Sequence, residues 1–219
     1  MDEISAERKV EFMRVIVGCE FSQVVTTAFR HRGHEAYSCD ILPEEGGHPE
    51  WHIQDDILEV LKREHFDLGI FHPPCTYLSY AGIAYWNNPG RLEKRLEALN
   101  FFAKLWLAPI EKICIENPRG CASPTIAKYS QEIQPFYFGD SDIKTTWLWL
   151  KNLPKLKHFE KQTLFEKQTH VEKPESYSID NTPRQKKRYY TDGKTRDPYL
   201  RSKTFSGIAD AFASQWSEL

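Results

Sequence analysis

An α/β fold with a mainly parallel sheet flanked by helices is predicted by the order of patterns along this chain. Short β-branched runs alternate with helical patterns over roughly the first half of the sequence. Helices placed between strands imply crossover connections, which pair the strands in parallel. The chain has 219 residues, of which 40% are hydrophobic and 27% charged, as in an ordinary globular protein. We therefore expect a single domain over residues 1–219.

The individual elements follow from periodicity and from the residues that end each pattern. Strands are predicted at residues 14–18, 35–39, 67–71 and 112–116, and helices at 21–32, 56–64 and 91–107. Ser22 is the expected N-cap of the first helix, and Gly33 is its expected C-terminal stop. Further strands are candidates at residues 136–138 and 145–150, and residues 206–216 predict a closing helix.

An apolar stripe in the longest predicted helix, 91–107, predicts that it packs against the core. The stripe consists of Leu92, Leu96, Leu99, Phe102, Leu105 and Trp106. The remaining parts are a polar leader at 1–12, an irregular basic segment at 151–203 and the closing helix within 204–219.

Charge is distributed unevenly along the chain. The formal net charge is -2, yet residues 184–203 hold eight Lys or Arg against two Asp. A local excess of positive charge suits a polyanionic partner, although a solvated loop without a partner has the same composition. The residues predicted to contact nucleic acid are Arg184, Lys186, Lys187, Arg188, Arg201 and Lys203.

Five cysteines, an odd number without any CxxC pair, favour reduced thiols over a disulfide framework. No Cys or His pairs fall at zinc-finger spacing, so no metal site is expected. Neither a signal peptide nor an apolar run of membrane-spanning length is evident. We expect a soluble, intracellular protein with no membrane partner, and we expect His31 and His34 to be solvated at a helix end.

Chemically useful residues follow each predicted strand. Gly18 to Ser22 follow the first strand, Asp40 and Ile41 the second, His72 to Cys75 the third, and Glu116 with Asn117 end the fourth. Ligands of open parallel sheets bind outside the carboxyl ends of the strands. The sequence therefore predicts a site that gathers these four strand ends.

The same residues resemble those of the cytosine-5 DNA methyltransferases. Residues 66–82, Phe-Asp-Leu-Gly-Ile-Phe-His-Pro-Pro-Cys-Thr-Tyr-Leu-Ser-Tyr-Ala-Gly, are similar to that family's Pro-Cys segment, and Ile115-Glu-Asn-Pro118 to its Glu-Asn element. Within this family the chain resembles the short, phage-type cytosine methyltransferase-like proteins, and a phage-encoded protein of this kind is expected in the host cytoplasm. The resemblance implies a Rossmann-like methyltransferase fold, S-adenosylmethionine as cofactor and DNA as partner.

Catalytic roles are implied by this resemblance for three residues. Cys75 is the expected nucleophile, which adds to carbon 6 of cytosine and so makes carbon 5 able to accept a methyl group. Glu116 is expected to assist at ring nitrogen 3, and Asn117 to orient the loop or Cys75. A base in duplex DNA must be flipped out of the stack to reach such a site.

Cofactor contacts are implied for the strand-end residues. Glu20 is expected near the methionine amino group, Asp40 on the ribose, and residues 55–57 near the adenine. The full implied set is Gly18, Cys19, Glu20, Phe21, Ser22, Asp40, Ile41, Asp56, Ile57 and Pro73.

The chain departs from the family in three respects. Its first turn has one glycine, it has no Gln-x-Arg-x-Arg stretch, and it has few residues for target recognition, so a separate specificity partner is one possibility. Two alternatives stay open. One is a degenerate methyltransferase fold that binds nucleic acid or a nucleotide, and the other is an amino-methyltransferase that uses His72-Pro-Pro.

Overall fold

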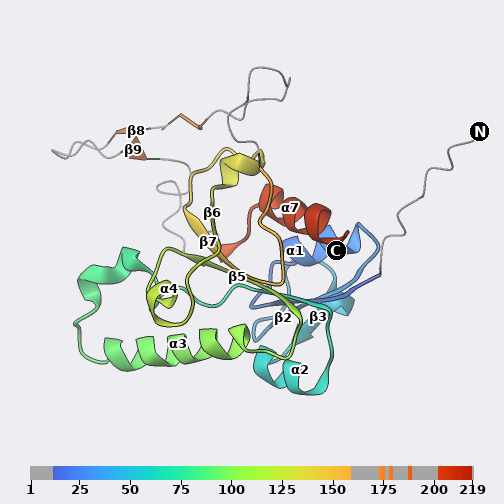
Figure 1. Ribbon diagram of the computed structural model, residues 1–219, viewed down its shortest axis with the longest axis horizontal. Coiled ribbons are helices and arrows are strands. Elements are labelled where there is room, and N and C mark those ends of the chain that lie inside the picture. The colour runs from blue at the N-terminus through green and yellow to red at the C-terminus, as the bar shows by residue number, and fades with distance from the viewer. Residues whose placement is uncertain (1–11, 159–172, 176–177, 180–186, 189–201, 219) are drawn as a thin grey trace, which may run out of the picture.

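A seven-stranded sheet with helices on both faces forms the body of the protein (Figure 1). The computed structural model describes residues 12–158, 173–175, 178–179, 187–188 and 202–218. The strand order is β3-β2-β1-β4-β5-β7-β6. The strands are β1 (Arg14–Gly18), β2 (Glu35–Asp40), β3 (His52–Gln54), β4 (Leu68–Phe71), β5 (Lys112–Pro118), β6 (Gln131–Ile133) and β7 (Thr146–Lys151).

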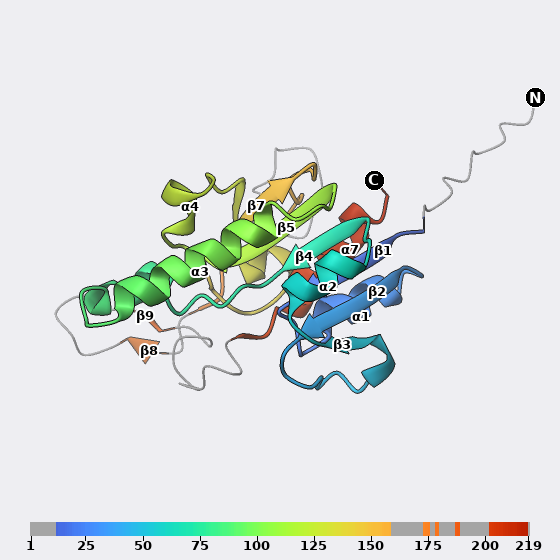
Figure 2. The same cartoon turned by 90° about the horizontal axis from the view of Figure 1, so that it is seen from below.

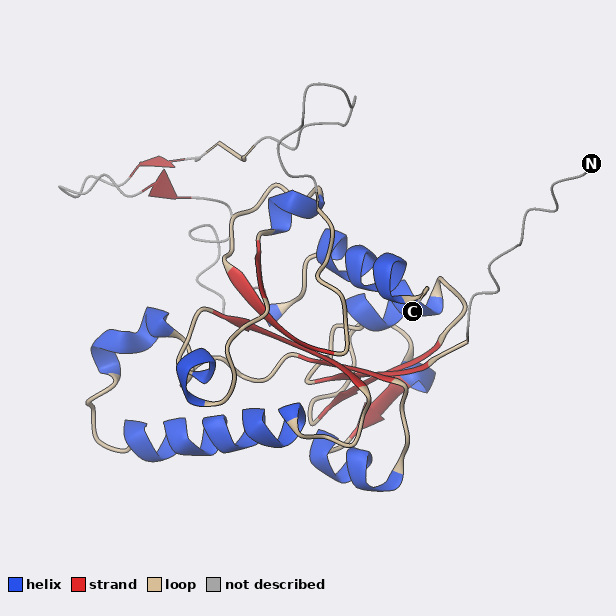
Figure 3. Cartoon of the chain, viewed as in Figure 1, coloured by secondary structure: helices blue, strands red, loops and turns tan. Residues whose placement is uncertain are grey.

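The sheet is parallel from β3 through β2, β1 and β4 to β5. Strand β7 runs antiparallel to β5, and β6 runs antiparallel to β7. The strand order reverses direction between β1 and β4, which is the switch point of a doubly wound sheet. This confirms the predicted fold class, a Rossmann-like α/β fold with a mainly parallel sheet flanked by helices (Figure 3).

Helices cover both faces of the sheet. Helices α1 (Val24–Arg30) and α7 (Ser206–Trp216) lie on one face, and α2 (Ile57–Arg63) and α3 (Arg91–Trp106) lie on the other (Figures 1 and 2). The shorter elements are η1 (Pro49–Trp51), η2 (Tyr80–Tyr85), α4 (Ala122–Thr125) and η3 (Pro135–Phe138), and a separate pair of β8 (Ser178–Ile179) and β9 (Lys187–Arg188). None of the helices that the structure describes is long and apolar enough to cross a membrane.

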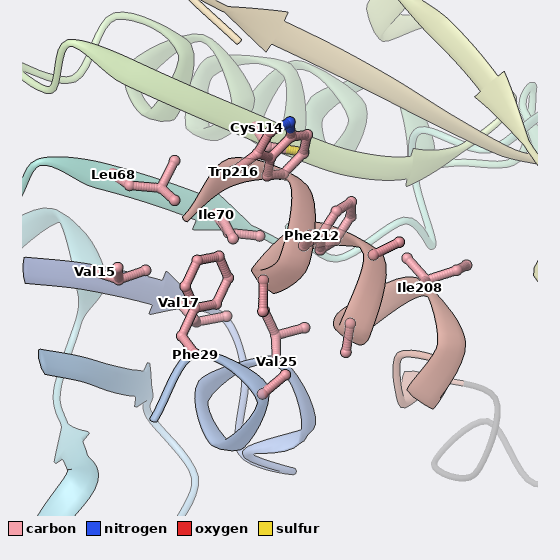
Figure 4. Close-up of a cluster of buried hydrophobic side chains, with 14 of the residues drawn as sticks. Val15, Val17, Val25, Phe29, Leu68, Ile70, Cys114, Ile208, Phe212 and Trp216 are labelled. Atoms are coloured by element: carbon pink, nitrogen blue, oxygen red, sulfur yellow. The ribbon is translucent and has the colours of Figure 1, made fainter. Parts of the chain in front are cut away.

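Two buried clusters, one on each face, explain why the central strands are apolar at every position. Val15 and Val17 pack with Phe29 of α1 and with Phe212 and Trp216 of α7 (Figure 4). The residues between them on the strands pack on the other face, as Ile16 and Phe71 do with Phe102 of α3. Strands buried on both faces read as continuous hydrophobic runs, which is the pattern that predicted them.

Most of the predicted elements occur, with three corrections. Residues 136–138 lie in the 3-10 turn η3 instead of a strand, because Pro135 begins a turn that Gly139 ends with φ +96°. Ser22 does not cap α1: Gln23 precedes the helix in a left-handed conformation, and the Glu20 carboxylate takes the capping role. The short strands β3 and β6 have no clear signal in the sequence.

The apolar stripe of α3 is buried only toward its C-terminal end. Phe102 and Leu105 are buried, but Leu92 is 54% exposed and Leu96 57% exposed. Figure 3 shows the N-terminal half of α3 and the preceding η2 extending past the ends of the strands. The prediction that the whole stripe packs on the core is therefore wrong, because the helix is longer than the sheet that it covers.

A buried histidine joins the end of the chain to the sheet. His34 is 2% exposed, which contradicts the expectation that it is solvated. Its Nδ1 accepts a hydrogen bond from the Met13 backbone N–H at 3.3 Å, so Nε2 carries the proton and bonds the Ser217 hydroxyl at 2.7 Å. Burial, followed by the charge of Arg32, lowers the pKa of His34.

The buried neutral ring of His34 makes folding sensitive to acid. An unfolded chain protonates this ring near its ordinary value of 6.5, whereas the folded protein resists protonation to a lower pH. The free energy of unfolding therefore falls as the pH drops below that value, by at most about 1.4 kcal/mol per pH unit for one proton. Urea unfolding between pH 8 and 5 should show a shallower fall for His34→Gln, while the control His31→Gln, at an exposed site, keeps the wild-type fall. Equal falls in all three proteins would contradict this assignment.

Candidate active site at the carboxyl edge of the sheet

The register of four neighbouring strands, β2, β1, β4 and β5, aligns the residues near their carboxyl ends. Gly18 lies opposite both Cys39 and Phe71, and Phe71 lies opposite Ile115. One step further along, His72 follows Phe71 and Glu116 follows Ile115. The His72 backbone N–H continues the ladder by donating to the Gly18 carbonyl at 3.0 Å. The predicted gathering of strand ends at one edge is therefore present.

His72 and Glu116 form a hydrogen-bonded pair at this edge. The His72 Nδ1 lies 3.0 Å from the Glu116 Oε2. Their side chains are only 8% and 13% exposed. Since side chains alternate along a strand, both point away from the face occupied by Phe71 and Ile115, toward the face that α1 and α7 cover.

Glu116 is ionised in spite of its burial. Burial opposes the charged form, but attraction to Lys144, hydrogen bonds from His72 and Thr146, and the charge of His72 outweigh it and lower the pKa of the carboxyl to about 2. An ionised carboxylate accepts hydrogen bonds and donates none. The proton between the pair therefore belongs to the Nδ1 of His72.

The loop that carries Cys75 is anchored to β5 by a buried amide. The Asn117 Nδ2 donates to the Pro73 carbonyl at 2.7 Å, and Asn117 is 2% exposed. The Cys75 carbonyl accepts hydrogen bonds from the backbone N–H groups of Leu78 and Ser79, which turn the chain toward η2. Asn117 thus holds Pro73, two residues before Cys75, in place.

Cys75 is half-buried, and the other cysteines are poor nucleophiles. Burial raises the pKa of Cys39 to about 12 and raises the pKa of Cys19, Cys114 and Cys121 as well. Thiols with raised pKa values stay protonated at neutral pH, and only the thiolate attacks carbon. Cys75 is the remaining candidate for a reactive thiol.

The Glu20 carboxylate is engaged by a helix. Its two oxygens accept hydrogen bonds from the backbone N–H groups of Val25 and Thr26 at 2.7 and 3.2 Å, and from the Thr26 hydroxyl at 2.7 Å. The free N–H groups at the start of α1 need acceptors, and this carboxylate supplies them. Sequence reasoning expected Glu20 to pair with the methionine amino group of a cofactor, whereas the structure directs its oxygens into the helix.

The ends of β1 and β2 lie together, as a cofactor site requires. The Glu20 N–H donates to the Cys39 carbonyl at 3.2 Å, and the charge of Asp40 is among the causes that raise the pKa of Cys19. Cys19 has φ +60°, a conformation that glycine adopts without strain. Asp40 is half-buried, and the neighbouring Ile41 is 73% exposed. A carboxylate beside an exposed apolar side chain fits the ribose and the adenine of a nucleoside.

Other predicted cofactor residues have structural roles. Asp56 caps α2, with its Oδ1 accepting from the Leu58 N–H at 2.8 Å. Ile57 is 4% exposed and packs so closely that a Cβ on Gly18 would come within 2.8 Å of it. Pro73 is buried, and Phe21 and Ser22 are half-buried in the turn before α1.

Three of the six predicted nucleic-acid contacts lie outside the described residues. This holds for Arg184, Lys186 and Arg201, while Lys187 and Arg188 form β9. The sixth residue of the set, Lys203, places its Nζ 3.1 Å from the Glu45 Oε2, and the Glu45 N–H donates to the Phe21 carbonyl. The segment before α7 thus returns to the β1 turn.

Lys144 and Thr146 belong to the site, yet sequence reasoning did not identify them. Thr146 begins β7 and lies opposite Pro118 at the end of β5, so the antiparallel strand begins where β5 ends. The sequence predicts a strand at 145–150, but it does not show which strand lies next to it in the sheet. Among the described residues, no cluster of three His, Cys, Asp or Glu is arranged to hold a metal ion.

Comparisons with known proteins return partial structural matches. No family model matches the chain, and no curated protein matches it. An rRNA methylase from Escherichia coli is 14% identical over 64% of this chain and 57% of its own, with a TM-score of 0.37. The 16S rRNA methylase RmtB is 12% identical over 64% of this chain and 56% of its own, with a TM-score of 0.30. Our chain thus matches less than two thirds of each, and such scores carry no argument about activity or substrate.

Lys144 should control the charge of Glu116. The substitution Lys144→Gln removes a positive charge that stabilises the Glu116 carboxylate. The pKa of Glu116 should therefore rise above its present value of about 2. A ¹³C titration of the glutamate carboxyl signals measures the change. The exposed Lys128 provides the control, since Lys128→Gln should leave the Glu116 signal unmoved. The same pKa in all three proteins would rule out this role of Lys144.

Asn117 should matter for stability through the Pro73 carbonyl. Asn117→Ala leaves that buried acceptor unpaired, which we expect to cost about 1–3 kcal/mol of unfolding free energy in urea. Gln54→Ala is a matched control, because its amide also donates to a carbonyl, that of Ile41 at 3.3 Å, but from an exposed side chain. A cost for Asn117→Ala no greater than that for the control would contradict the anchoring role.

Proposed function

We propose that the protein is an S-adenosylmethionine-dependent DNA (cytosine-5)-methyltransferase. The observation that supports this most is the arrangement of Asn117, which holds the Cys75 loop against the strand that carries Glu116. A nucleophile and a carboxyl group are thereby attached to neighbouring strands at the edge where ligands of such sheets bind.

The proposed chemistry requires both groups. The Cys75 thiolate adds to carbon 6 of cytosine, and the electrons displaced from the ring make carbon 5 nucleophilic. Nitrogen 3 gains basicity during this addition and takes a proton that Glu116 presents. Proton transfer of this kind contributes about 10²–10⁴-fold to a rate.

The nucleoside of the cofactor is assigned to the ends of β1 and β2. Asp40 is proposed to bind the ribose hydroxyls and Ile41 to contact the adenine. S-Adenosylmethionine supplies an electrophilic methyl group when it is bound. Glu20 stabilises the turn that forms this part of the site, because its carboxylate caps α1.

The amino-methyltransferase alternative fits the geometry less well. In that chemistry the polar residue before Pro-Pro accepts a hydrogen bond from the target amine. Here the residue at that position is His72, and its Nδ1 is engaged by Glu116 at 3.0 Å. The alternative also gives no role to Cys75 or to the ionised Glu116.

The negative charge at this edge also disfavours the alternative that the protein only binds the phosphate backbone of a nucleic acid. Glu116 is ionised at this edge and Asp40 lies at its β2 end, and carboxylates repel phosphate. These groups suit the hydrogen-bonding edge of a base and the hydroxyls of a ribose. Duplex contact is proposed for the basic residues of segment 184–203, with a separate partner supplying any sequence specificity that the short chain lacks.

Mechanism-based trapping tests the proposed function. Protein incubated with S-adenosylmethionine and DNA that contains 5-fluorocytosine should form a covalent adduct, because fluorine blocks the release of Cys75 from carbon 6. The adduct is detected as a shifted band on a denaturing gel. It should be absent with Cys75→Ala and present with Cys121→Ala, which removes the buried thiol of a residue whose backbone N–H donates to the Leu78 carbonyl, three residues after Cys75.

Two results would overturn the proposal. One is an adduct that persists in Cys75→Ala, which would place the nucleophile elsewhere. The other is the absence of any adduct with both duplex and single-stranded DNA, while calorimetry shows that the protein binds S-adenosylmethionine.

A further inference from the structure

His72 stands between two carboxylates at the centre of the carboxyl edge. Glu116 on β5 holds its Nδ1 at 3.0 Å, and the charge of His72 also acts on Glu20, which follows β1. These three residues therefore come from three adjacent strands, in the order β1, β4 and β5. Lys144, before β7, is the charged group that acts on Glu116 alongside His72.

The ring of His72 is held rigidly. Its backbone N–H bonds the Gly18 carbonyl, and the next residue, Pro73, is fixed through its carbonyl by Asn117. The side chain is 8% exposed. Nε2 is buried and finds no hydrogen-bond partner within the described parts of the chain, so the bond to Glu116 is the contact that sets the ring's orientation.

The proposed chemistry has a proton requirement that Glu116 does not meet alone. The carboxylate is ionised in the folded protein, yet nitrogen 3 of cytosine must gain a proton as Cys75 adds to carbon 6. A proton source in contact with Glu116 is needed. The imidazole of His72 is such a group, because both ring nitrogens can carry a proton and Nδ1 lies 3.0 Å from the Glu116 Oε2.

We propose that His72 is a positioning residue that fixes Glu116 and supplies, through it, the proton that nitrogen 3 receives. The inference rests on the proposed function. As the bond from Cys75 Sγ to carbon 6 forms, the imidazolium of His72 passes its Nδ1 proton to the Glu116 Oε2, and Glu116 delivers a proton to nitrogen 3. His72 becomes neutral and the ring adduct carries no net charge. When Cys75 leaves carbon 6, the proton returns by the same route.

The two carboxylates explain why a histidine suits this position. The Glu116 carboxylate accepts from Nδ1, and the charge of His72 also acts on Glu20, so the ring interacts with acidic groups on both sides. An asparagine in place of His72 would preserve a donor at the position of Nδ1 but would carry no exchangeable charge. This difference separates a proton carrier from a purely structural hydrogen bond.

The test follows the release of tritium from carbon 5 of labelled cytosine in DNA, without cofactor. The adduct formed by Cys75 exchanges its carbon 5 hydrogen with water, so the release reports addition at carbon 6 alone. The wild-type rate should be bell-shaped in pH, rising as Cys75 ionises and falling as His72 loses its proton. His72→Asn should be about 10²-fold slower or more, and its rate should only rise with pH. His31→Asn, at an exposed site, should keep the wild-type profile.

The outcomes distinguish this inference from the proposed function. A falling limb retained in His72→Asn, or a rate equal to that of the wild type, would overturn the role of His72 while the nucleophile stands. Absence of tritium release together with absence of a 5-fluorocytosine adduct in the wild type would overturn both.

A second measurement does not depend on the variant. The ¹⁵N spectrum of the neutral His72 ring in the wild-type protein should place the proton on Nδ1. A proton on Nε2 instead would exclude His72 as the donor to Glu116.

Discussion

The parallel pairing of β1, β4 and β5 is the constraint on which the site depends. Because Gly18 lies opposite Phe71 and Phe71 opposite Ile115, the next residues, His72 after β4 and Glu116 within β5, meet at the same height. Gly18 allows the close approach, since a side chain there would come within 2.7 Å of the Phe71 ring. The hydrophobic strands that build the core therefore also determine which polar residues meet at its edge.

The edge carries a buried negative charge that the fold has to compensate. Removing a carboxylate from water is costly unless opposite charge and hydrogen bonds replace the water. For Glu116 the compensation comes from His72 on the preceding parallel strand and from Lys144 before the antiparallel strand. Strand β7, which lies against β5 in the reverse direction, thus contributes to the electrostatics of the site as well as to the sheet.

Polar residues at the strand ends serve two different purposes. Glu20 and Asp56 satisfy the N-terminal N–H groups of α1 and α2, and Asn117 satisfies the buried carbonyl of Pro73. These residues hold the loops in place. Cys75, His72, Glu116 and Asp40 are then positioned on a rigid support, which the proposed covalent mechanism requires.

The sequence by itself determined the order of most strands and helices along the chain, and it placed the Cys75 loop, Glu116 and Asn117 at the same edge of the sheet. Local patterns encode these features, because apolar periodicity defines a strand and the residue after it marks the edge. Only the tertiary structure decided that Glu20 caps a helix, that His34 is buried against Ser217, and that Lys144 acts on Glu116. Each of these depends on which segments become neighbours in space, and burial and pairing are properties of that arrangement, not of any single segment.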